Sequence, residues 1–330
     1  MDAEELKSRY ALGERDFDRE NLVGVNLTRT NLEKINLTGC SLAAADMSRA
    51  VLNEANLSDA FLYSSNMSFI KLGKGVLINA DLTKTNLHGA FLVKAQLSGA
   101  KLSGAILSGV NLRAANLVGV NLCGANLSGI NLRSANLKGA NLNWANLSRA
   151  RLNEATLEGA LLTGINLSKA HLMQVDLHEM DLNGVNFSQA KLKQANFRGA
   201  DLTATNFSEA DLTLADLQQA TLNGSNLKDA VLIASNLSGA ILMRTDLSYA
   251  VLTDANLTKA NFNLANLCKA DLSGACLQDA YFWKADLSEA NLDGADLSGA
   301  SLRGAILDGV DLRNVNLTGV TMSDGTIYNI

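Results

Sequence analysis

The side chains that could carry out chemistry are few and scattered in this sequence. Its three histidines are His88, His171 and His178. A histidine beside a serine and an aspartate could form a hydrolytic triad, and histidines grouped with cysteines could bind zinc. The four cysteines contain no Cys-x-x-Cys pair and no zinc-like spacing: Cys40, Cys123, Cys268 and Cys276. Reduced, isolated thiols fit this spacing, so we predict no disulfide, no metal site and no cofactor.

One glycine-rich segment, Gly73-Lys74-Gly75, raises the question of a phosphate-binding loop. It lacks the GxxxxGK(S/T) spacing with which such loops hold phosphates. Gly75 also occupies a position that alanine holds in most of the chain, so we expect a local bulge or bend here. No catalytic motif remains, and we predict that the protein is not an enzyme.

The composition limits the class of protein. The chain has 330 residues, no proline and a formal net charge of −5, from 28 basic and 33 acidic residues. Average usage of about 5% would give roughly 16 prolines, and linkers normally carry them, so domains joined by spacers are not expected. Residues 1–10 do not resemble a secretory signal, and no apolar run approaches the ~18 residues that span a bilayer. We therefore expect a cytoplasmic protein without a membrane segment.

The elements that must position any site follow from a repeat of five residues. Every fifth position from Phe17 to Ile327 is bulky and apolar: 53 Leu, six Phe, three Met and one Ile. Two positions earlier, 38 of 61 residues are Ala, and one position earlier, 39 of 63 are Asn or Asp. The residue two places after the central Leu is the site of 22 of the 26 glycines.

A period of five fits neither an ordinary helix nor a flat strand. Steps of five rotate by about 140° on an α-helix, which scatters the leucines around the cylinder. On a strand, five is odd, so successive leucines would face opposite sides. The leucines converge only if the chain turns a corner in each repeat, with Leu and Ala inside and Asn or Asp outside. Ten of the 17 serines that follow the central residue share one phase of a 20-residue period, which predicts four walls per coil.

The repeat A(N/D)LXX resembles that of pentapeptide-repeat proteins from about residue 17 to 327. The segment Tyr10-Ala-Leu-Gly-Glu-Arg-Asp-Phe17 is similar to the Y-A-x-G-x-R-x-F opening of many cyanobacterial members. Met322-Ser-Asp-Gly-Thr326 is similar to their M-P-D-G-T/S ending, with Ser323 where proline is usual. The resemblance implies an all-β solenoid, a right-handed quadrilateral β-helix, and the 63 repeats at four per coil predict about 15–16 coils.

The two ends of such a coil need covering. Asp2 and Glu5 have the spacing of a capping box, and Gly13 suits the end of a short helix. The last coil has weaker repeats, which predicts either a distorted cap or an end that dimerises. The expected organisation is an N-terminal cap with a short helix at 1–16, a single continuous β-helix at 17–327 and a tail at 328–330.

Charge is unevenly distributed along the chain. Residues 1–60 have 11 acidic and 7 basic side chains, residues 61–153 have 1 and 10, and residues 154–330 have 21 and 11. Six cations of the middle segment share one wall phase, and we call them the basic stripe: Lys71, Lys74, Lys94, Arg113, Arg133 and Arg151. We expect a docking face for an acidic partner. Because we expect no aromatic side chains between these cations and the whole chain is acidic, we do not expect a nucleic-acid ligand.

Outward apolar residues are the second irregularity. Five of them lie on one wall in three successive coils, and we call them the apolar patch: Ile241, Met243, Leu264, Tyr281 and Trp283. Exposed apolar patches commonly mark protein interfaces. A second, less aromatic group is predicted on the opposite wall, at Leu214, Val231, Ile233 and Val251.

These features favour a protein–protein interaction scaffold or regulatory adaptor that presents a rigid surface. Resemblance to the family implies an alternative, a DNA mimic that inhibits gyrase or topoisomerase. The acidic segment 154–330 suits that alternative, whereas the basic segment 61–153 opposes it. We expect protein partners, with a homodimer through the C-terminal end as one form of association.

Overall fold

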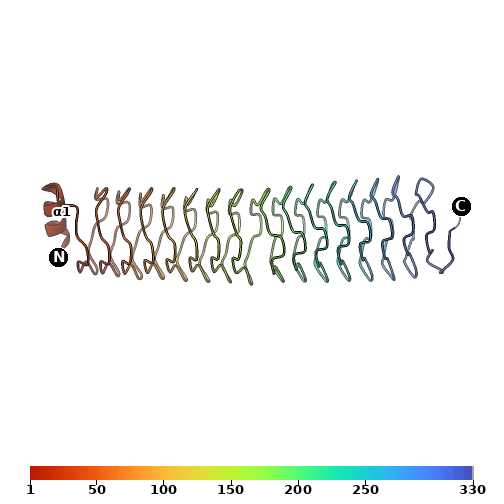
Figure 1. Ribbon diagram of the computed structural model, residues 1–330, viewed down its shortest axis with the longest axis horizontal. Helices are drawn as coiled ribbons and strands as arrows, with labels where there is room; N and C mark the ends of the chain where they lie inside the picture. Colours follow the sequence, from red (N-terminus) through yellow and green to blue (C-terminus); the bar gives the residue numbers. More distant parts are fainter. Residues whose placement is uncertain (329–330) are drawn as a thin grey trace. The chain divides into compact units, whose positions relative to one another are not determined.

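The computed structural model describes residues 1–328 and divides the chain into two compact units, Met1–Asn166 and Leu167–Ile330. The one helix among the described residues is α1 (Ala3–Ala11), in unit 1 (Figure 1). Outside α1, parallel β-bridges join residues that are twenty apart, such as Asn111 with Asn131 and Asn206 with Asn226. The predicted coil of four pentapeptides is therefore confirmed within each unit. That the units form one continuous β-helix stays a prediction.

We name the four walls A to D by the Asn/Asp positions 101, 106, 111 and 116, each of which recurs every twenty residues. The repeat Asn131–Ala135 shows why this five-residue pattern is stable, since each of its N–H groups has an acceptor. The N–H groups of Asn131, Leu132 and Ser134 bond to neighbouring coils at 2.8–3.0 Å, and that of Ala135 bonds back to Leu132 O at 3.0 Å. The N–H of Arg133 donates to Asn131 Oδ1 at 3.2 Å. Buried and half-buried backbone groups are thus satisfied, and a proline at four of the five positions would remove a bond to another backbone group.

The corner between two walls is a tight turn. In the turn Leu42–Ala45, the N–H of Ala45 donates to Leu42 O at 3.1 Å, and Ala44 has φ of +55°. Positive φ at the third residue alone is the pattern of a type II turn, which favours glycine. This explains why most glycines lie two places after the central Leu.

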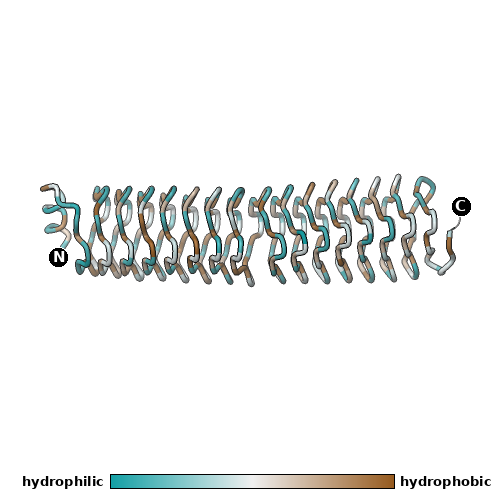
Figure 2. The backbone as a smooth tube through the Cα atoms, in the orientation of Figure 1, coloured by the Kyte–Doolittle hydropathy of each residue, from teal (hydrophilic) through white to brown (hydrophobic). Residues whose placement is uncertain are grey.

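The interior consists of the central Leu, Phe and Met side chains and of the Ala position. Leu132 and Ala135 are both fully buried, as are Phe187, Phe197 and Phe207, whose rings pack at 5.1–5.8 Å between centroids. Hydrophilic and hydrophobic residues alternate along the coils of each unit (Figure 2). The inward assignment of Leu and Ala is therefore confirmed for most of the chain.

The expected bulge at Gly75 is wrong. The bridges of Lys71 with Phe91 and of Val76 with Gln96 continue through this coil without a change of register. A Cβ atom at residue 75 would lie 2.6 Å from Leu72 Cγ, so the Leu72 side chain occupies the space that an alanine side chain would take and would have to move.

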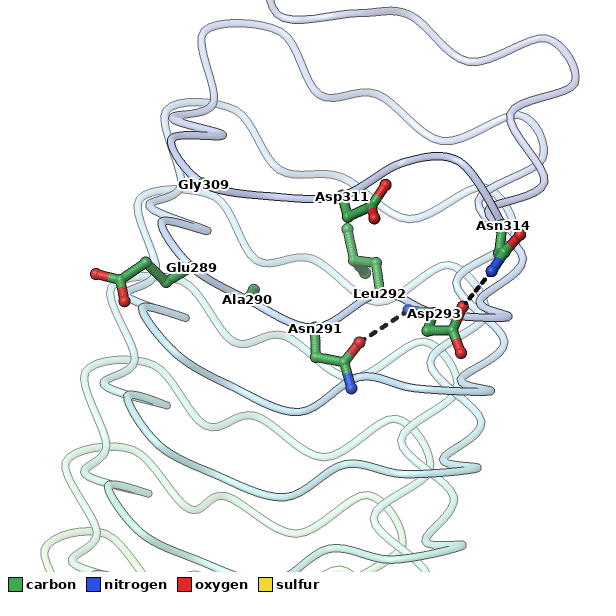
Figure 3. A pocket seen from close by; sticks show the side chains of 8 residues that line it. All are labelled: Glu289, Ala290, Asn291, Leu292, Asp293, Gly309, Asp311 and Asn314. Atoms are coloured by element: carbon green, nitrogen blue, oxygen red, sulfur yellow. Dashed lines mark hydrogen bonds between the residues drawn. The ribbon is translucent and has the colours of Figure 1, made fainter.

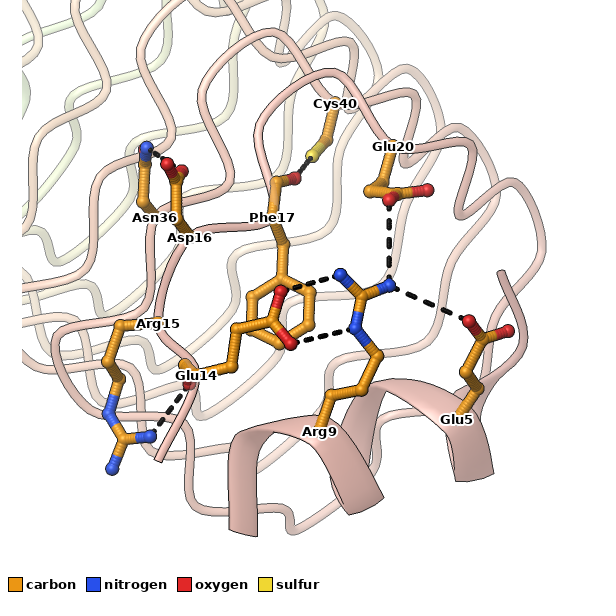
Figure 4. A network of polar contacts seen from close by, with 9 residues as sticks. All are labelled: Glu5, Arg9, Glu14, Arg15, Asp16, Phe17, Glu20, Asn36 and Cys40. Carbon is orange, nitrogen blue, oxygen red and sulfur yellow. Dashed lines mark hydrogen bonds and ion pairs between the residues drawn. The ribbon is translucent and has the colours of Figure 1, made fainter. Parts of the chain in front are cut away.

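Helix α1 confirms the predicted N-terminal cap. Asp2 is its N-cap and accepts a hydrogen bond from the Glu5 N–H at 2.9 Å, and Leu6 is fully buried. Arg9 holds the helix to the first coil, since its guanidinium donates to Glu14 at 2.8 Å and lies 5.1 Å from the Phe17 ring centroid (Figure 4). The carboxylates of Glu5 and Glu20 also approach Arg9, at 3.6 and 3.8 Å.

The last coil differs from the regular repeat. The N–H of Gly294 donates to Asn314 O, one residue beyond the acceptor that the regular pattern would give it. The chain then reverses at Met322–Thr326, and Thr321 pairs antiparallel with Ile327. Ile327 is therefore 61% exposed, so its expected inward position is wrong. Tyr328 bonds back to Val320, and residues 329–330 of the predicted tail lie outside the described residues.

Candidate interaction surfaces

The apolar patch lies on wall A of unit 2. Ile241 and Tyr281 each form a β-bridge with Asn261, which places them in adjacent coils on either side of it. Tyr281 is 52% and Trp283 44% exposed, while Met243 and Leu264 are half-buried. The backbone N–H of Leu264 donates to Trp283 O at 2.9 Å, so Leu264 and Trp283 lie side by side in neighbouring coils. All five predicted residues are thus brought together.

Asparagines of the preceding coil compensate for the apolar residues in this patch. Ile241 and Tyr281 occupy the Asn/Asp position. Their side chains cannot accept a hydrogen bond from the backbone N–H of the turn residue two positions later, as Asn or Asp does. Asn223 Oδ1 accepts the Met243 N–H at 3.3 Å, and Asn263 Oδ1 accepts the Trp283 N–H at 2.8 Å. Sequence reasoning missed these two residues, although the signal was present: an Asn just after the central Leu, followed 18 residues later by a residue other than Asn or Asp.

The basic stripe lies on wall C of unit 1, and all six of its side chains are exposed. Lys74 Nζ lies 3.2 Å from Glu54, which also pairs with Lys34 at 3.9 Å, so Lys74 shares one carboxylate with a second lysine. For the other five cations, the described part of the chain places no carboxylate within ion-pair distance.

The expectation that no aromatic residue interleaves the stripe is wrong. Phe91 forms a β-bridge with Lys71, is 46% exposed, and its ring covers Gly73. Phe91 was overlooked because it occupies an Asn/Asp position and not the central Leu position, where six phenylalanines of the repeat were counted. That the stripe does not bind nucleic acid stays a prediction, and it now depends on the acidic net charge alone.

The second apolar group also lies where it was expected, on wall C of unit 2. Val231 and Val251 are bridged, and the N–H of Leu214 donates to Ile233 O at 2.9 Å. This group contains no aromatic side chain, which makes it the weaker candidate for an interface.

Sequence reasoning missed a further set of exposed aromatic side chains in unit 1: Phe61, Tyr63, Phe69, Phe91 and Trp144. Phe69 packs against His88, with the ring centroids 5.3 Å apart, and the Arg49 guanidinium lies 5.5 Å from its centroid. Trp144 is 68% exposed and lies over Gly164, where an added Cβ would come within 2.3 Å of the indole.

Two of the histidines lie beside a polar side chain. His88 Nδ1 lies 2.8 Å from Ser108 Oγ in unit 1, and His178 Nδ1 lies 2.8 Å from Asp176 in unit 2. Burial raises the pKa of the Cys40 thiol to about 11, which disfavours the thiolate. Among residues 1–328, no group of three or more His, Cys, Asp or Glu is placed to hold a metal ion.

One pocket of about 330 Å³ opens where the last coil changes register (Figure 3). Asn314 Nδ2 donates to Asp293 Oδ1 at 2.8 Å across it. Asp311 pairs with Arg313, whose hydrogen bonds lower the pKa of that carboxyl to about 2. The pocket is lined by Glu289, Ala290, Asn291, Leu292, Asp293, Gly309, Asp311 and Asn314.

Known protein families match the repeats described above. The family of pentapeptide repeats matches in eight copies between residues 14 and 324, and a pentapeptide repeat region matches residues 150–227. Together these matches cover well over half of the chain. The chain belongs to the pentapeptide repeat family, and its fold is the right-handed quadrilateral β-helix of that family.

Solved structures of this family are similar to the chain. HetL, a pentapeptide repeat protein involved in heterocyst differentiation regulation from the cyanobacterium Nostoc, is 28% identical, with 99% of this chain and 100% of HetL covered and a TM-score of 0.24. QnrB1, a plasmid-mediated fluoroquinolone resistance protein, is 21% identical over 65% of this chain and 88% of its own, with a TM-score of 0.36. Rfr23 from the cyanobacterium Cyanothece is 29% identical over 51% of this chain and 97% of its own, with a TM-score of 0.17.

Comparison with curated protein sequences found no match. No helix within residues 1–328 is long and apolar enough to cross a membrane.

Proposed function

We propose that the protein is a non-enzymatic scaffold or regulatory adaptor that binds partner proteins through the fixed surface of its coils. The observation that carries the proposal is the exposed pair Tyr281 and Trp283, which lies on the same wall as Ile241, Met243 and Leu264. The Trp283 N–H is held by a hydrogen bond to Asn263. Tyrosine and tryptophan are enriched at the centres of protein interfaces, and a rigid backbone lowers the entropy lost on binding. Association in the cytoplasm with an unrelated protein, or with a second copy through the C-terminal end, would both fit a scaffold.

The test compares the wild type with the Tyr281→Ala/Trp283→Ala double variant. Both are used to capture proteins from a lysate of the source organism, and their oligomeric mass is measured by light scattering. We expect the variant to lose at least one captured protein or one step of self-association while its melting temperature stays the same. Lys193→Ala/Lys259→Ala, at two exposed positions on other walls of unit 2, is the control. Identical captured proteins and identical mass for all three forms would refute the proposed role of the patch.

The acidity of unit 2 supports a second candidate, a DNA mimic that inhibits gyrase or topoisomerase. Unit 2 has 19 acidic and 11 basic residues, whereas unit 1 has 14 and 17. An excess of carboxylates on one part of a β-helix could occupy a DNA-binding surface. A supercoiling assay with gyrase separates the two candidates, because a scaffold without DNA mimicry leaves supercoiling unchanged at micromolar protein.

A further inference from the structure

We propose that the apolar patch binds an acidic amphipathic α-helix of another protein. This inference rests on the scaffold function proposed above and specifies the chemistry of the partner. Its starting point is the distribution of charge among the four walls of unit 2.

Wall A is free of carboxylates around the patch. Between residues 221 and 304, its five outward segments (221–224, 241–244, 261–264, 281–284 and 301–304) contain no Asp or Glu. All nine acidic residues of this stretch lie on the other three walls. Wall A carries three cations instead, namely Arg244, Lys284 and Arg303. Unit 2 has an excess of acidic residues. In the coils of the apolar patch, however, wall A is the one wall that carries no acidic residue.

The three cations border the apolar side chains and have no counter-charge. Lys284 Nζ lies 4.7 Å from the Trp283 ring centroid. Arg244, Leu264 and Lys284 are each the third residue of the turn, with positive φ, in successive coils. The leucine therefore lies between two cations. Within residues 1–328, no carboxylate lies within ion-pair distance of Arg244, Lys284 or Arg303.

The apolar patches of two copies of this chain do not fit each other. Two patches that face each other would bring together the cations of both copies with no carboxylate between them, and like charges at an interface are unfavourable. A partner that offers carboxylates beside apolar side chains satisfies both parts of the surface.

The spacing of the coils favours a helix as the partner element. Successive coils lie about 4.8 Å apart, and one turn of an α-helix rises about 5.4 Å. A helix that runs along the coil axis therefore places apolar residues at i, i+4 and i+7 opposite the three coils that carry Ile241, Leu264 and Tyr281. Glu or Asp residues on the flanks of that stripe would reach Arg244 and Lys284.

The experiment selects binders from a random 16-residue peptide library displayed on phage, with the full chain immobilised. The same selection is repeated with Tyr281→Ala/Trp283→Ala and with Arg244→Glu/Lys284→Glu. A matched control, Lys193→Glu/Lys259→Glu, reverses two exposed cations on other walls. Thermal melts show that each variant is folded.

We expect the wild type to enrich peptides that are net negative, with apolar residues three or four apart. A synthetic copy of the most enriched peptide should bind both patch variants roughly tenfold or more weakly, and the control within about twofold. The inference is overturned if no peptide depends on Tyr281 and Trp283, if the enriched peptides are neutral or basic, or if Arg244→Glu/Lys284→Glu has no effect. In that last case, capture that still depends on Tyr281 and Trp283 would leave the scaffold function standing.

Discussion

The backbone N–H of Trp283 donates to Oδ1 of Asn263, in the preceding coil, at 2.8 Å. In a regular repeat the acceptor is the Asn or Asp two residues earlier, but Tyr281 occupies that position. The asparagine therefore lets an aromatic residue face outward without leaving the turn unsatisfied. Lys71 and Leu161 are supported in the same way by Asn53 and Asn143.

We predict that Asn263→Ala lowers the free energy of unfolding by about 0.5–1.5 kcal/mol, because the Trp283 N–H loses its acceptor within the protein. Asn183→Ala is the matched control, since Thr203 in the next coil bonds to its own Asp201 at 2.9 Å. Urea unfolding of both variants checks this. An equal, small effect of the two substitutions would contradict the role of Asn263.

Substitutions in the interior should be costly in both directions. Leu132→Ala should lower the free energy of unfolding by about 2–5 kcal/mol through lost burial and a cavity. Ala135→Leu should cost about 1–3 kcal/mol because the buried Ala position has no room for a larger side chain. Arg133→Ala, on the exposed part of the same repeat, should stay within about 0.5 kcal/mol of wild type. Chemical unfolding curves decide, and wild-type behaviour of both interior variants would contradict the inward assignment.

Helix α1 should protect the first coil. Leu6→Ala should cost about 2–5 kcal/mol locally, because Leu6 is fully buried under the helix. Stacked coils depend on their neighbours, so the amides of residues 17–27 should exchange with solvent faster, while those near 130 do not change. Leu12→Ala is the control, since Leu12 is 89% exposed. Equal exchange in both variants would show that α1 does not cover the end.

Stability should fall in acid, and Asp46 should contribute to this. The Ser48 backbone N–H donates to Asp46 at 2.9 Å and lowers the pKa of that carboxyl below its usual value of 3.8. A lowered folded-state pKa stabilises the fold at neutral pH, and this contribution is lost as the pH falls below about 4 toward the folded-state pKa. Asp46→Asn keeps an acceptor that does not titrate, so the loss of stability between pH 7 and pH 3 should be smaller. An unchanged loss would contradict this assignment.

Much of the fold follows from the sequence because one constraint repeats. The inward Leu132 and Ala135 and the outward Asn131 share a frame that does not slip, so one repeat predicts the others. The handedness of the coil comes from family membership, since a period of twenty residues is the same in either hand. The hairpin at Met322–Thr326 was not predicted because Ile327 keeps the frame in sequence while the backbone reverses.

The surfaces were predicted only in part. The period of twenty residues placed Tyr281 and Trp283 on the same wall as Ile241, Met243 and Leu264, because residues twenty apart lie in adjacent coils. It missed Phe91 among the cations and Asn263 beneath Trp283, because both depend on a side chain that replaces the usual Asn or Asp. Each of these replacements of Asn or Asp concerns a single repeat, whereas the residue that contacts it lies in the adjacent coil, twenty residues away in the sequence.

The most direct test of the scaffold function is photo-crosslinking from position 283. Trp283 is replaced with the photoreactive residue p-benzoylphenylalanine, the protein is irradiated in a lysate of the source organism, and adducts are identified by mass spectrometry. Lys193, an exposed residue on wall C, is replaced in the same way as the control. We predict an adduct with another polypeptide from position 283 that is absent from position 193. No adduct at 283, or the same adducts from both positions, would contradict the scaffold function.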